Sequence, residues 1–175
     1  MLEETNHPHI TRVFELMEDS KNYYVVMELI SGGNLFERII QFDSFNEAEA
    51  SRIIKQLALA CNYMHGLNIM HRDLKPENIM VGEYGEVLVM DWGLAKVLGE
   101  REESSSAVGR VNDTGDYGMT MEGEVMGTPQ YMSPEQAEGM VAELDARSDI
   151  YSLGGILYAI LTLRPPIDGK TLNEV

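Results

Sequence analysis

The sequence predicts an α+β fold in which two antiparallel hairpins accompany a mostly helical remainder. Two pairs of short β-rich runs are each joined by a polar turn, which is the pattern of a β-hairpin. Two longer segments repeat apolar residues at helical spacing. The chain has 175 residues, of which 44% are hydrophobic, so it can bury one hydrophobic core.

The first hairpin is predicted within residues 10–29, where the runs ITRVFELM and NYYVVMEL flank the polar turn EDSK. Both alternating faces of the second run are mostly apolar, so we expect this strand to be covered on both sides. Gly32 and Gly33 then interrupt the pattern before a short helical segment at residues 34–41.

A longer helix is predicted to begin after Asn46, whose side chain can cap the first turn. Because the neighbours of Cys61 on this helix are apolar, we expect a buried hydrophobic residue there and not a nucleophile. Cys61 is the only cysteine, which excludes an intrachain disulfide and a thiolate zinc site and fits a reducing, cytoplasmic compartment. The apolar stripe that should face the core consists of Ala50, Ile53, Leu57, Cys61 and Met64.

The second half of the chain predicts another hairpin, a loop and a helix. The runs IMV and EVLVM are joined by a GEYG turn. Residues 98–125 contain serines, glycines and acids without apolar periodicity, so we expect an exposed, mobile loop. Residues 146–163 predict a buried helix that Pro165 and Pro166 end, and its apolar run is too short to cross a bilayer.

The charge balance excludes two classes of partner. Lys and Arg number 13 against 29 Asp and Glu, which gives a formal net charge of −16. Such a chain repels nucleic-acid backbones and anionic membrane surfaces. The acidic, polar start also lacks the apolar core of a secretory signal, so a cytoplasmic location is expected.

Three short motifs occur in a fixed order along the chain. The first has the form H-R-D-L-x-x-x-N, the second is an acidic D-x-G after a predicted strand, and the third is a Ser-Pro-Glu block after GTPQYM. Each residue alone would be an ordinary turn or core residue, whereas the ordered set indicates one shared site. The motifs are filled by His71, Arg72, Asp73, Leu74 and Asn78, then by Asp91, Trp92 and Gly93, and finally by Ser133, Pro134 and Glu135.

In order and spacing these motifs resemble those of protein kinases, in particular the eukaryotic-like serine/threonine protein kinases of bacteria. The resemblance implies a protein-kinase-like fold, with residues 1–30 as the end of the N-lobe and the hinge. Residues 31–175 would form the C-lobe up to its central hydrophobic helix. The implied activity is transfer of the ATP γ-phosphate to Ser or Thr hydroxyls of protein substrates, with ATP and Mg²⁺ as cofactors.

The resemblance assigns roles to the catalytic residues. Asp73 would orient the substrate hydroxyl and accept its proton, and Lys75 would screen the charge of the transferred phosphate. Asn78 and Asp91 would supply the hard oxygen ligands that Mg²⁺ prefers.

Nucleotide binding is implied at a second group of residues. Glu28 and Ile30 would lie on the hinge that offers backbone hydrogen bonds to adenine, with Met27 at the gatekeeper position and Met80 beneath the ring. For both methionines, plain core packing is the alternative. The residues from His7 to His9 resemble a structural turn of the family, and a metal pair there would lack a third ligand nearby.

Other residues would shape and regulate the site by resemblance. Thr128 would hydrogen-bond Asp73 and Lys75. Asp149 would tie back to the catalytic-loop backbone near His71 and Arg72, although an acid is also favourable at a helix N-terminus by itself. Glu124 would replace part of the charge of a phosphorylated loop residue, or would be one more solvated acid. The set of activation and structural residues is His71, Arg72, Trp92, Gly93, Glu124, Thr128, Glu135 and Asp149.

The sequence departs from a whole kinase in several features. It contains no Gly-rich loop, no strand lysine and no helix glutamate of the kinase pattern, nor the arginine that pairs with Glu135. Trp92 stands where the family usually has phenylalanine. We therefore expect an incomplete catalytic domain that is inactive alone, with possible tethering or sensor domains outside it. The alternatives are a pseudokinase-like binding or scaffold domain and a regulatory fragment that associates with an intact kinase.

Overall fold

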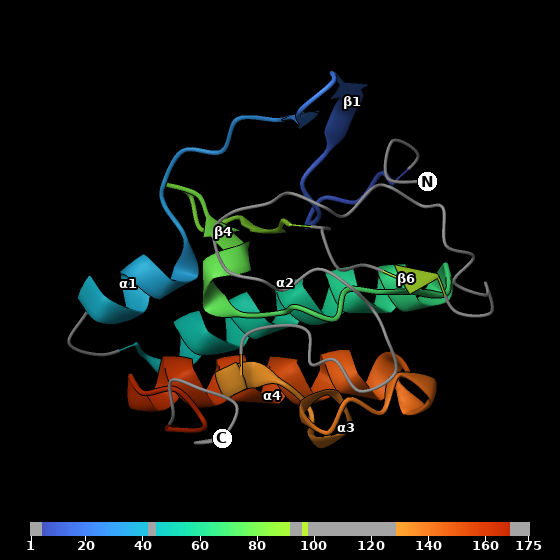
Figure 1. The fold of residues 1–175 in the computed structure, drawn as a ribbon. Helices are drawn as coiled ribbons and strands as arrows, with labels where there is room; N and C mark the ends of the chain where they lie inside the picture. The colour runs from blue at the N-terminus through green and yellow to red at the C-terminus, as the bar shows by residue number, and fades with distance from the viewer. Residues whose placement is uncertain (1–4, 42–44, 92–95, 98–128, 169–175) are drawn as a thin grey trace.

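The computed structural model describes residues 5–41, 45–91, 96–97 and 129–168. The described chain separates into a β-hairpin and a mainly helical body, as Figure 1 shows. In chain order the first half contains β1 (Val13–Glu18), β2 (Tyr23–Met27), α1 (Leu35–Gln41), α2 (Glu47–Gly66) and β3 (Ile69–Met70). The second half contains η2 (Pro76–Asn78), β4 (Ile79–Val81), β5 (Val87–Val89), β6 (Lys96–Val97), η3 (Pro129–Tyr131), α3 (Pro134–Ala137), η4 (Val141–Glu143) and α4 (Ala146–Thr162).

The predicted first hairpin is confirmed. Strands β1 and β2 pair antiparallel, with Leu16 opposite Val25. The turn is fixed by Asp19, whose carboxylate accepts hydrogen bonds from the backbone N–H groups of Lys21 and Asn22. An aspartate that bonds the backbone two and three residues on is typical of such turns.

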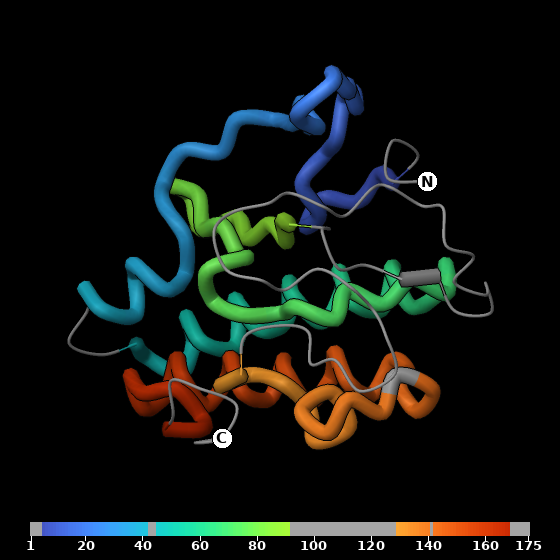
Figure 2. Tube along the Cα trace, viewed as in Figure 1, coloured from blue at the N-terminus to red at the C-terminus, as the bar shows by residue number. Residues whose placement is uncertain are grey.

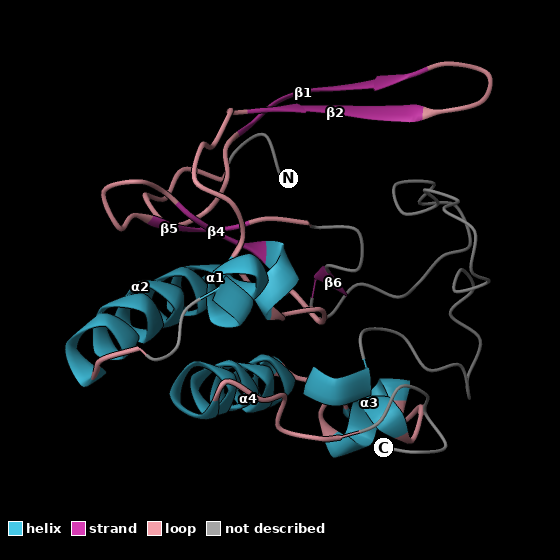
Figure 3. Ribbon diagram, turned by 90° about the vertical axis from the view of Figure 1, so that its left-hand side faces the viewer, coloured by secondary structure: helices cyan, strands magenta, loops and turns pink. Residues whose placement is uncertain are grey.

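The prediction that the second strand is covered on both sides is wrong. Tyr24, Val25, Val26 and Met27 are each 38–46% exposed. In the described part of the chain β2 pairs only with β1, and the hairpin extends away from the helices, as Figure 3 shows from the side. The apolar run therefore identified a strand here, but the described chain leaves both of its faces substantially exposed.

Helix α2 agrees with its prediction in its start and its buried face. The Asn46 side chain accepts a hydrogen bond from the Glu49 backbone N–H at 2.9 Å, and the Glu49 carboxylate accepts one from the Asn46 backbone N–H. This reciprocal capping box satisfies N–H groups that a helix start otherwise leaves unpaired. All five residues of the predicted stripe are buried. Burial raises the pKa of the Cys61 thiol to about 12, which fits a structural and unreactive cysteine.

Helix α4 packs against α2, and the two helices lie side by side in the body (Figure 2). Elsewhere on α4, Gly155 permits close packing of Pro166 and Tyr131, because a Cβ there would lie 3.1 Å from Pro166 and 3.2 Å from Tyr131. The prediction of a buried helix at residues 146–163 is only partly right. Ile156 and Ile160 are completely buried, whereas the opposite face is exposed at Ile150, Tyr151, Tyr158 and Leu161, since no described residue covers it. No described helix is long and apolar enough to cross a membrane.

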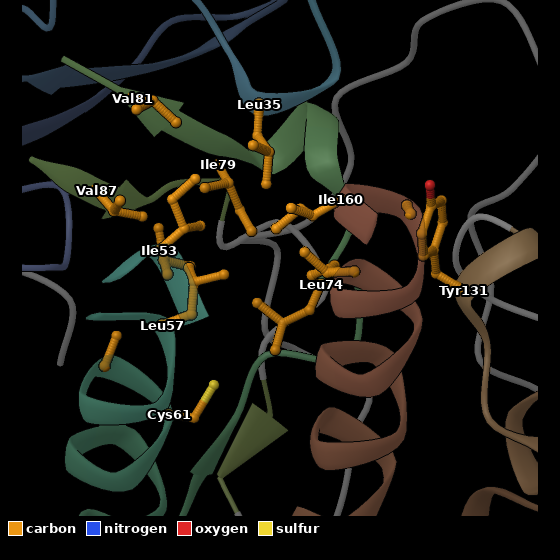
Figure 4. Packing of buried hydrophobic residues seen from close by; sticks show 14 of the residues in the cluster. Leu35, Ile53, Leu57, Cys61, Leu74, Ile79, Val81, Val87, Tyr131 and Ile160 are labelled. Atoms are coloured by element: carbon orange, nitrogen blue, oxygen red, sulfur yellow. The ribbon is translucent and has the colours of Figure 1, made fainter. Parts of the chain in front are cut away.

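The second hairpin, β4–β5, joins the N-terminal segment to the helices. Its register places Met80 opposite Leu88. An isolated bridge pairs Ile10 with Val89, and another pairs Asn34 with Met80. Figure 4 shows how apolar side chains from α1, α2, β4, β5 and α4 converge on one core. The segment around His7 and His9 is a turn, as predicted, closed by a hydrogen bond from the Ile10 N–H to the His7 carbonyl.

Two leucines on α2 test this core. Leu57 is 0% exposed, whereas Leu59 is 45% exposed on the same helix. We expect Leu57→Ala to lower the free energy of unfolding by about 2–5 kcal/mol, because it leaves a cavity in the core. Leu59→Ala should change it by less than about 0.5 kcal/mol. Urea unfolding followed by circular dichroism measures both, and equal losses would contradict the placement of the core.

Candidate active site

The segment from His71 to Asn78, which we call the catalytic loop, is anchored by a buried acid on α4. Asp149 is 1% exposed, and its two carboxylate oxygens accept hydrogen bonds from the backbone N–H groups of His71 at 3.0 Å and Arg72 at 2.9 Å. Arg72 has φ 66°, a left-handed conformation that costs free energy for a residue with a side chain. The Asp149 carboxylate thus stabilises the backbone at Arg72, where the left-handed conformation is unfavourable.

A third donor completes the surroundings of Asp149. His65 Nε2, at the end of α2, lies 2.8 Å from Asp149 Oδ2. Burial raises the pKa of this carboxyl, but the hydrogen bonds from His65 and from the two backbone N–H groups outweigh it, and the pKa lies below its ordinary value. The anionic form is therefore the one that the fold stabilises.

His71 connects the catalytic loop to the end of β5. Its side chain is fully buried, with Nε2 3.0 Å from the Met90 carbonyl oxygen. The Asp73 backbone N–H donates to His71 Nδ1 at 3.3 Å, which assigns the ring proton to Nε2 and makes Nε2 the donor to Met90. His71 thereby fixes the position of Asp73 relative to the residue that precedes Asp91.

Asp73, Lys75 and Asn78 form one polar cluster. Asp73 Oδ2 lies 2.9 Å from Lys75 Nζ and 3.0 Å from Asn78 Nδ2. The Asn78 amide also donates to the Asp73 carbonyl oxygen at 2.9 Å, which closes the loop on itself. A carboxylate held in this way can accept a proton in a defined direction, with a cation beside it.

Asp91 follows β5 and also has a left-handed backbone, with φ 65°. The Met90 N–H donates to the Asn78 carbonyl oxygen at 2.9 Å, so the chain enters Asp91 beside Asn78. The Asn78 amide nitrogen is engaged by Asp73, which leaves its amide oxygen as the group that could hold a cation. One carboxylate and one amide oxygen are hard donors that fit Mg²⁺ bound together with phosphate oxygens. No group of three or more His, Cys, Asp or Glu that could hold a metal ion occurs in the described ranges.

The predicted hinge residues lie at the end of the first hairpin. Met27 is the last residue of β2, and the Glu28 N–H donates to the Arg12 carbonyl oxygen at 3.0 Å. The Glu28 carboxylate accepts from the Arg12 N–H at 2.7 Å, so its side chain is engaged within the hairpin. Met80 is half-buried on β4, and Ile30 is half-buried after the hairpin. Met27, Glu28 and Ile30 thus lie at the end of the first hairpin or just after it, whereas Met80 lies on β4, and their common role stays a prediction.

The Ser-Pro-Glu block forms the start of α3, and its Glu135 contacts α4. Ser148 Oγ donates to Glu135 Oε1 at 2.6 Å. Burial raises the pKa of Glu135, but hydrogen bonds led by the one from Ser148 lower it overall. The neighbouring Gln136 donates from Nε2 to the Arg72 carbonyl oxygen at 2.7 Å.

Sequence reasoning missed the contact of His65 with the Asp149 anchor, that of Gln136 with the loop, and the bond from Ser148 to Glu135 that links α4 to α3. The spacing of Ser133 and Gln136 was a usable signal, because a Ser followed three residues later by Gln marks a capping box. Trp92, Gly93, Glu124 and Thr128 lie outside the described residues, as does the loop predicted at 98–125, and these assignments stay predictions.

Comparison with known proteins is consistent with this geometry. The protein kinase domain family matches residues 1–175. The chain is 37% identical to Calcium-dependent protein kinase 5 of Plasmodium falciparum over 178 residues, covering 100% of this chain and 28% of that protein. It is 37% identical to Serine/threonine-protein kinase PknD of Protochlamydia amoebophila, covering 99% of this chain and 19% of that protein. It is 39% identical to Probable serine/threonine-protein kinase PknB of Corynebacterium glutamicum, covering 95% of this chain and 24% of that protein.

The catalytic-loop geometry and these matches together define the class of protein. The chain belongs to the protein kinase family. It spans only 19–28% of the length of the three relatives named above.

The Asp149 anchor predicts a pH-dependent stability. A carboxyl whose pKa is lowered by folding stabilises the fold above its unfolded pKa, ordinarily 3.8, and loses that contribution as the pH falls through the lower folded value. Asp149→Asn should cost about 3–5 kcal/mol near pH 7, the usual result of removing one partner from a buried charged network. Urea unfolding of the parent and of Asp149→Asn should show the difference between their free energies of unfolding narrowing below pH 3.8.

The exposed Asp168 provides the control, since Asp168→Asn removes the same charge without a buried partner. A gap between the parent and Asp149→Asn that stays constant down to the acid unfolding limit would contradict the stabilised carboxylate.

Proposed function

We propose that this chain is the catalytic core of an ATP-dependent serine/threonine protein kinase. The proposal rests chiefly on Asp73, whose Oδ2 lies within 3.0 Å of both Lys75 Nζ and Asn78 Nδ2. The names of the bacterial relatives, which are serine/threonine-protein kinases, support the choice of hydroxyl substrates. Protein substrates with Ser or Thr residues are the proposed partners.

The catalytic step assigns a role to each residue of the cluster. The Asp73 carboxylate orients the substrate hydroxyl and accepts its proton as the hydroxyl oxygen bonds to the γ-phosphorus, while the bond from that phosphorus to the β–γ bridging oxygen breaks and ADP leaves. The Lys75 ammonium, beside the same carboxylate, compensates negative charge on the transferred phosphoryl group. Asp73 and Lys75 are held in place before the substrate binds. The rate enhancement therefore comes mainly from alignment of the reacting groups and from a positive charge that is already in position.

ATP and Mg²⁺ are the proposed cofactors. The Asn78 amide oxygen and the Asp91 carboxylate would hold the metal, and the bound metal would neutralise charge on the ATP phosphates. Adenine would lie against Met27 and Met80. The Glu28 N–H is already bonded to Arg12, so the backbone groups offered to the base would be the Glu28 carbonyl and those of Ile30.

The remaining predicted residues complete this proposal. Thr128 would bond Asp73 and Lys75, and Glu124 would supply part of the negative charge that Arg72 attracts. Trp92 and Gly93 would pack and turn the chain after the metal-binding Asp91. In this arrangement residues 1–30 serve as the end of the N-lobe and the hinge, and residues 31–175 as the C-lobe.

A second candidate is a kinase-like binding domain without turnover. The observation in its favour is the position of the lysines that precede the catalytic loop. Lys21 is exposed in the β1–β2 turn and Lys55 is exposed on α2, so neither lies on a strand as the phosphate-pairing lysine of the family does. We therefore propose that the 175 residues alone do not transfer phosphate.

Activity is testable in the chain joined to an N-terminal segment that supplies a Gly-rich loop, a strand lysine and a helix glutamate. We expect transfer of label from γ-labelled ATP to Ser or Thr of a protein substrate, dependent on added Mg²⁺. Asp73→Asn should lower the rate by about two to four orders of magnitude, because the positioned base and its charge are lost.

The control is Glu83→Gln, which removes an exposed carboxylate in the β4–β5 turn. It should leave the rate unchanged. Equal rates in the parent and Asp73→Asn would overturn the assignment of Asp73. Nucleotide binding without any phosphate transfer in the extended chain would favour the binding domain.

A further inference from the structure

Gln136 is a buried polar residue that uses both ends of its amide group. Its side chain lies on α3, and the residue is 5% exposed. Oε1 accepts hydrogen bonds from the Ser133 N–H at 3.1 Å and from Ser133 Oγ at 3.2 Å. Nε2 donates to the Arg72 carbonyl oxygen at 2.7 Å, across 64 residues of sequence. One amide group therefore connects the start of α3 to the catalytic loop.

Arg72 is held on both sides of its peptide backbone. Its N–H donates to Asp149 on α4, and its carbonyl oxygen accepts from Gln136 on α3. The two helices are themselves linked by the short hydrogen bond from Ser148 to Glu135. These contacts form a closed ring around a residue with a left-handed backbone, a conformation that persists only where the surroundings enforce it.

We propose that Gln136 is a positioning residue that holds the Arg72 peptide and thereby fixes the direction of Asp73, the next residue. The consequence for catalysis rests on the function proposed above, whereas the effect on the loop does not. Gln136 does not contact the Asp73–Lys75–Asn78 cluster in any described hydrogen bond, so it acts only through the backbone.

The chemistry of the amide group offers a direct test. A carboxylate at this position can still accept from Ser133, as in the common Ser-x-x-Glu capping box, but it cannot donate to the Arg72 carbonyl. A protonated carboxyl can do both. Gln136→Glu therefore removes the hydrogen bond to the Arg72 carbonyl when the introduced carboxyl is ionised, and protonation of that carboxyl at low pH restores it.

The experiment measures amide hydrogen exchange at His71, Arg72 and Asp73 in the 175-residue chain between pH 5 and pH 9, corrected for intrinsic exchange. In Gln136→Glu we expect protection at these amides to equal that of the parent at low pH. It should fall by about tenfold as the introduced carboxyl ionises, as expected for a lost hydrogen bond that leaves a buried acceptor unpaired. His65 and His71 face the same amides in both chains, so the transition is measured as the difference in protection between Gln136→Glu and the parent.

Two further variants make the result decisive. Gln41→Glu introduces the same chemical change at an exposed position at the end of α1, and it should leave the loop amides unchanged at every pH. Gln136→Met, of similar length but without a donor, should lower the protection of the loop at all pH values, and it substitutes for Gln136→Glu if that chain does not fold. Parent-like protection in both Gln136 variants, or an equal loss at all amides of the chain, would overturn the proposal.

Kinetics in the extended chain separate this proposal from the proposed function. Gln136→Glu should lower kcat at high pH without raising KM for ATP, because Gln136 contacts the loop and not the proposed nucleotide site. If the loop amides respond as expected but no variant and no parent transfers phosphate, the positioning role stands and the proposed function fails. If the parent transfers phosphate and kcat of Gln136→Glu equals that of the parent at every pH, the positioning role fails.

Discussion

The described structure depends on one buried carboxylate, that of Asp149. Burying a charge is costly unless donors surround it, and here three donors do so: the His65 side chain and the backbone N–H groups of His71 and Arg72. These donors come from the end of α2 and from the catalytic loop, whereas the acceptor lies in the first turn of α4. The packing of α4 on α2 and the conformation of the loop are therefore energetically linked, since a shift of α2 removes the His65 donor and a shift of α4 separates the carboxylate from all three donors.

The same constraint explains how a loop with little regular structure can present aligned groups. Only two residues form β3, and η2 has three, so the ladder hydrogen bonds around the cluster are few. The loop obtains its rigidity from buried side chains instead: Asp149 on its N–H side, Gln136 on its carbonyl side and His71 toward Met90. The backbone is left-handed at both Arg72 and Asp91. This conformation costs free energy, and these contacts maintain it.

The sequence predicted individual helices, strands and turns well, but it predicted less well which of their faces other elements cover. The capping of α2 by Asn46, its buried stripe and the two hairpins depend on residues close together in the chain, so periodicity and turn chemistry were enough to find them. The exposure of Val25 and Val26 on β2, and that of Tyr158 on α4, could not be predicted, because an apolar pattern identifies a face without saying what covers it. The bond from Gln136 to Arg72 joins residues 64 positions apart, which no local pattern reports.

This contrast also explains which parts of the site could be found from sequence. Asp73, Lys75, Asn78 and Asp91 occur within one short stretch, so their fixed order marks a shared chemistry even without a structure. The groups that hold the loop come from three helices: His65 on α2, Gln136 on α3 and Asp149 on α4. Their residue types are common in proteins, and only their burial against the loop distinguishes them. The proposed reacting groups thus lie close together in the sequence, whereas the residues that hold the loop lie far from them, and a substitution among the distant residues should change the direction of Asp73 and leave the chemistry of its carboxylate intact.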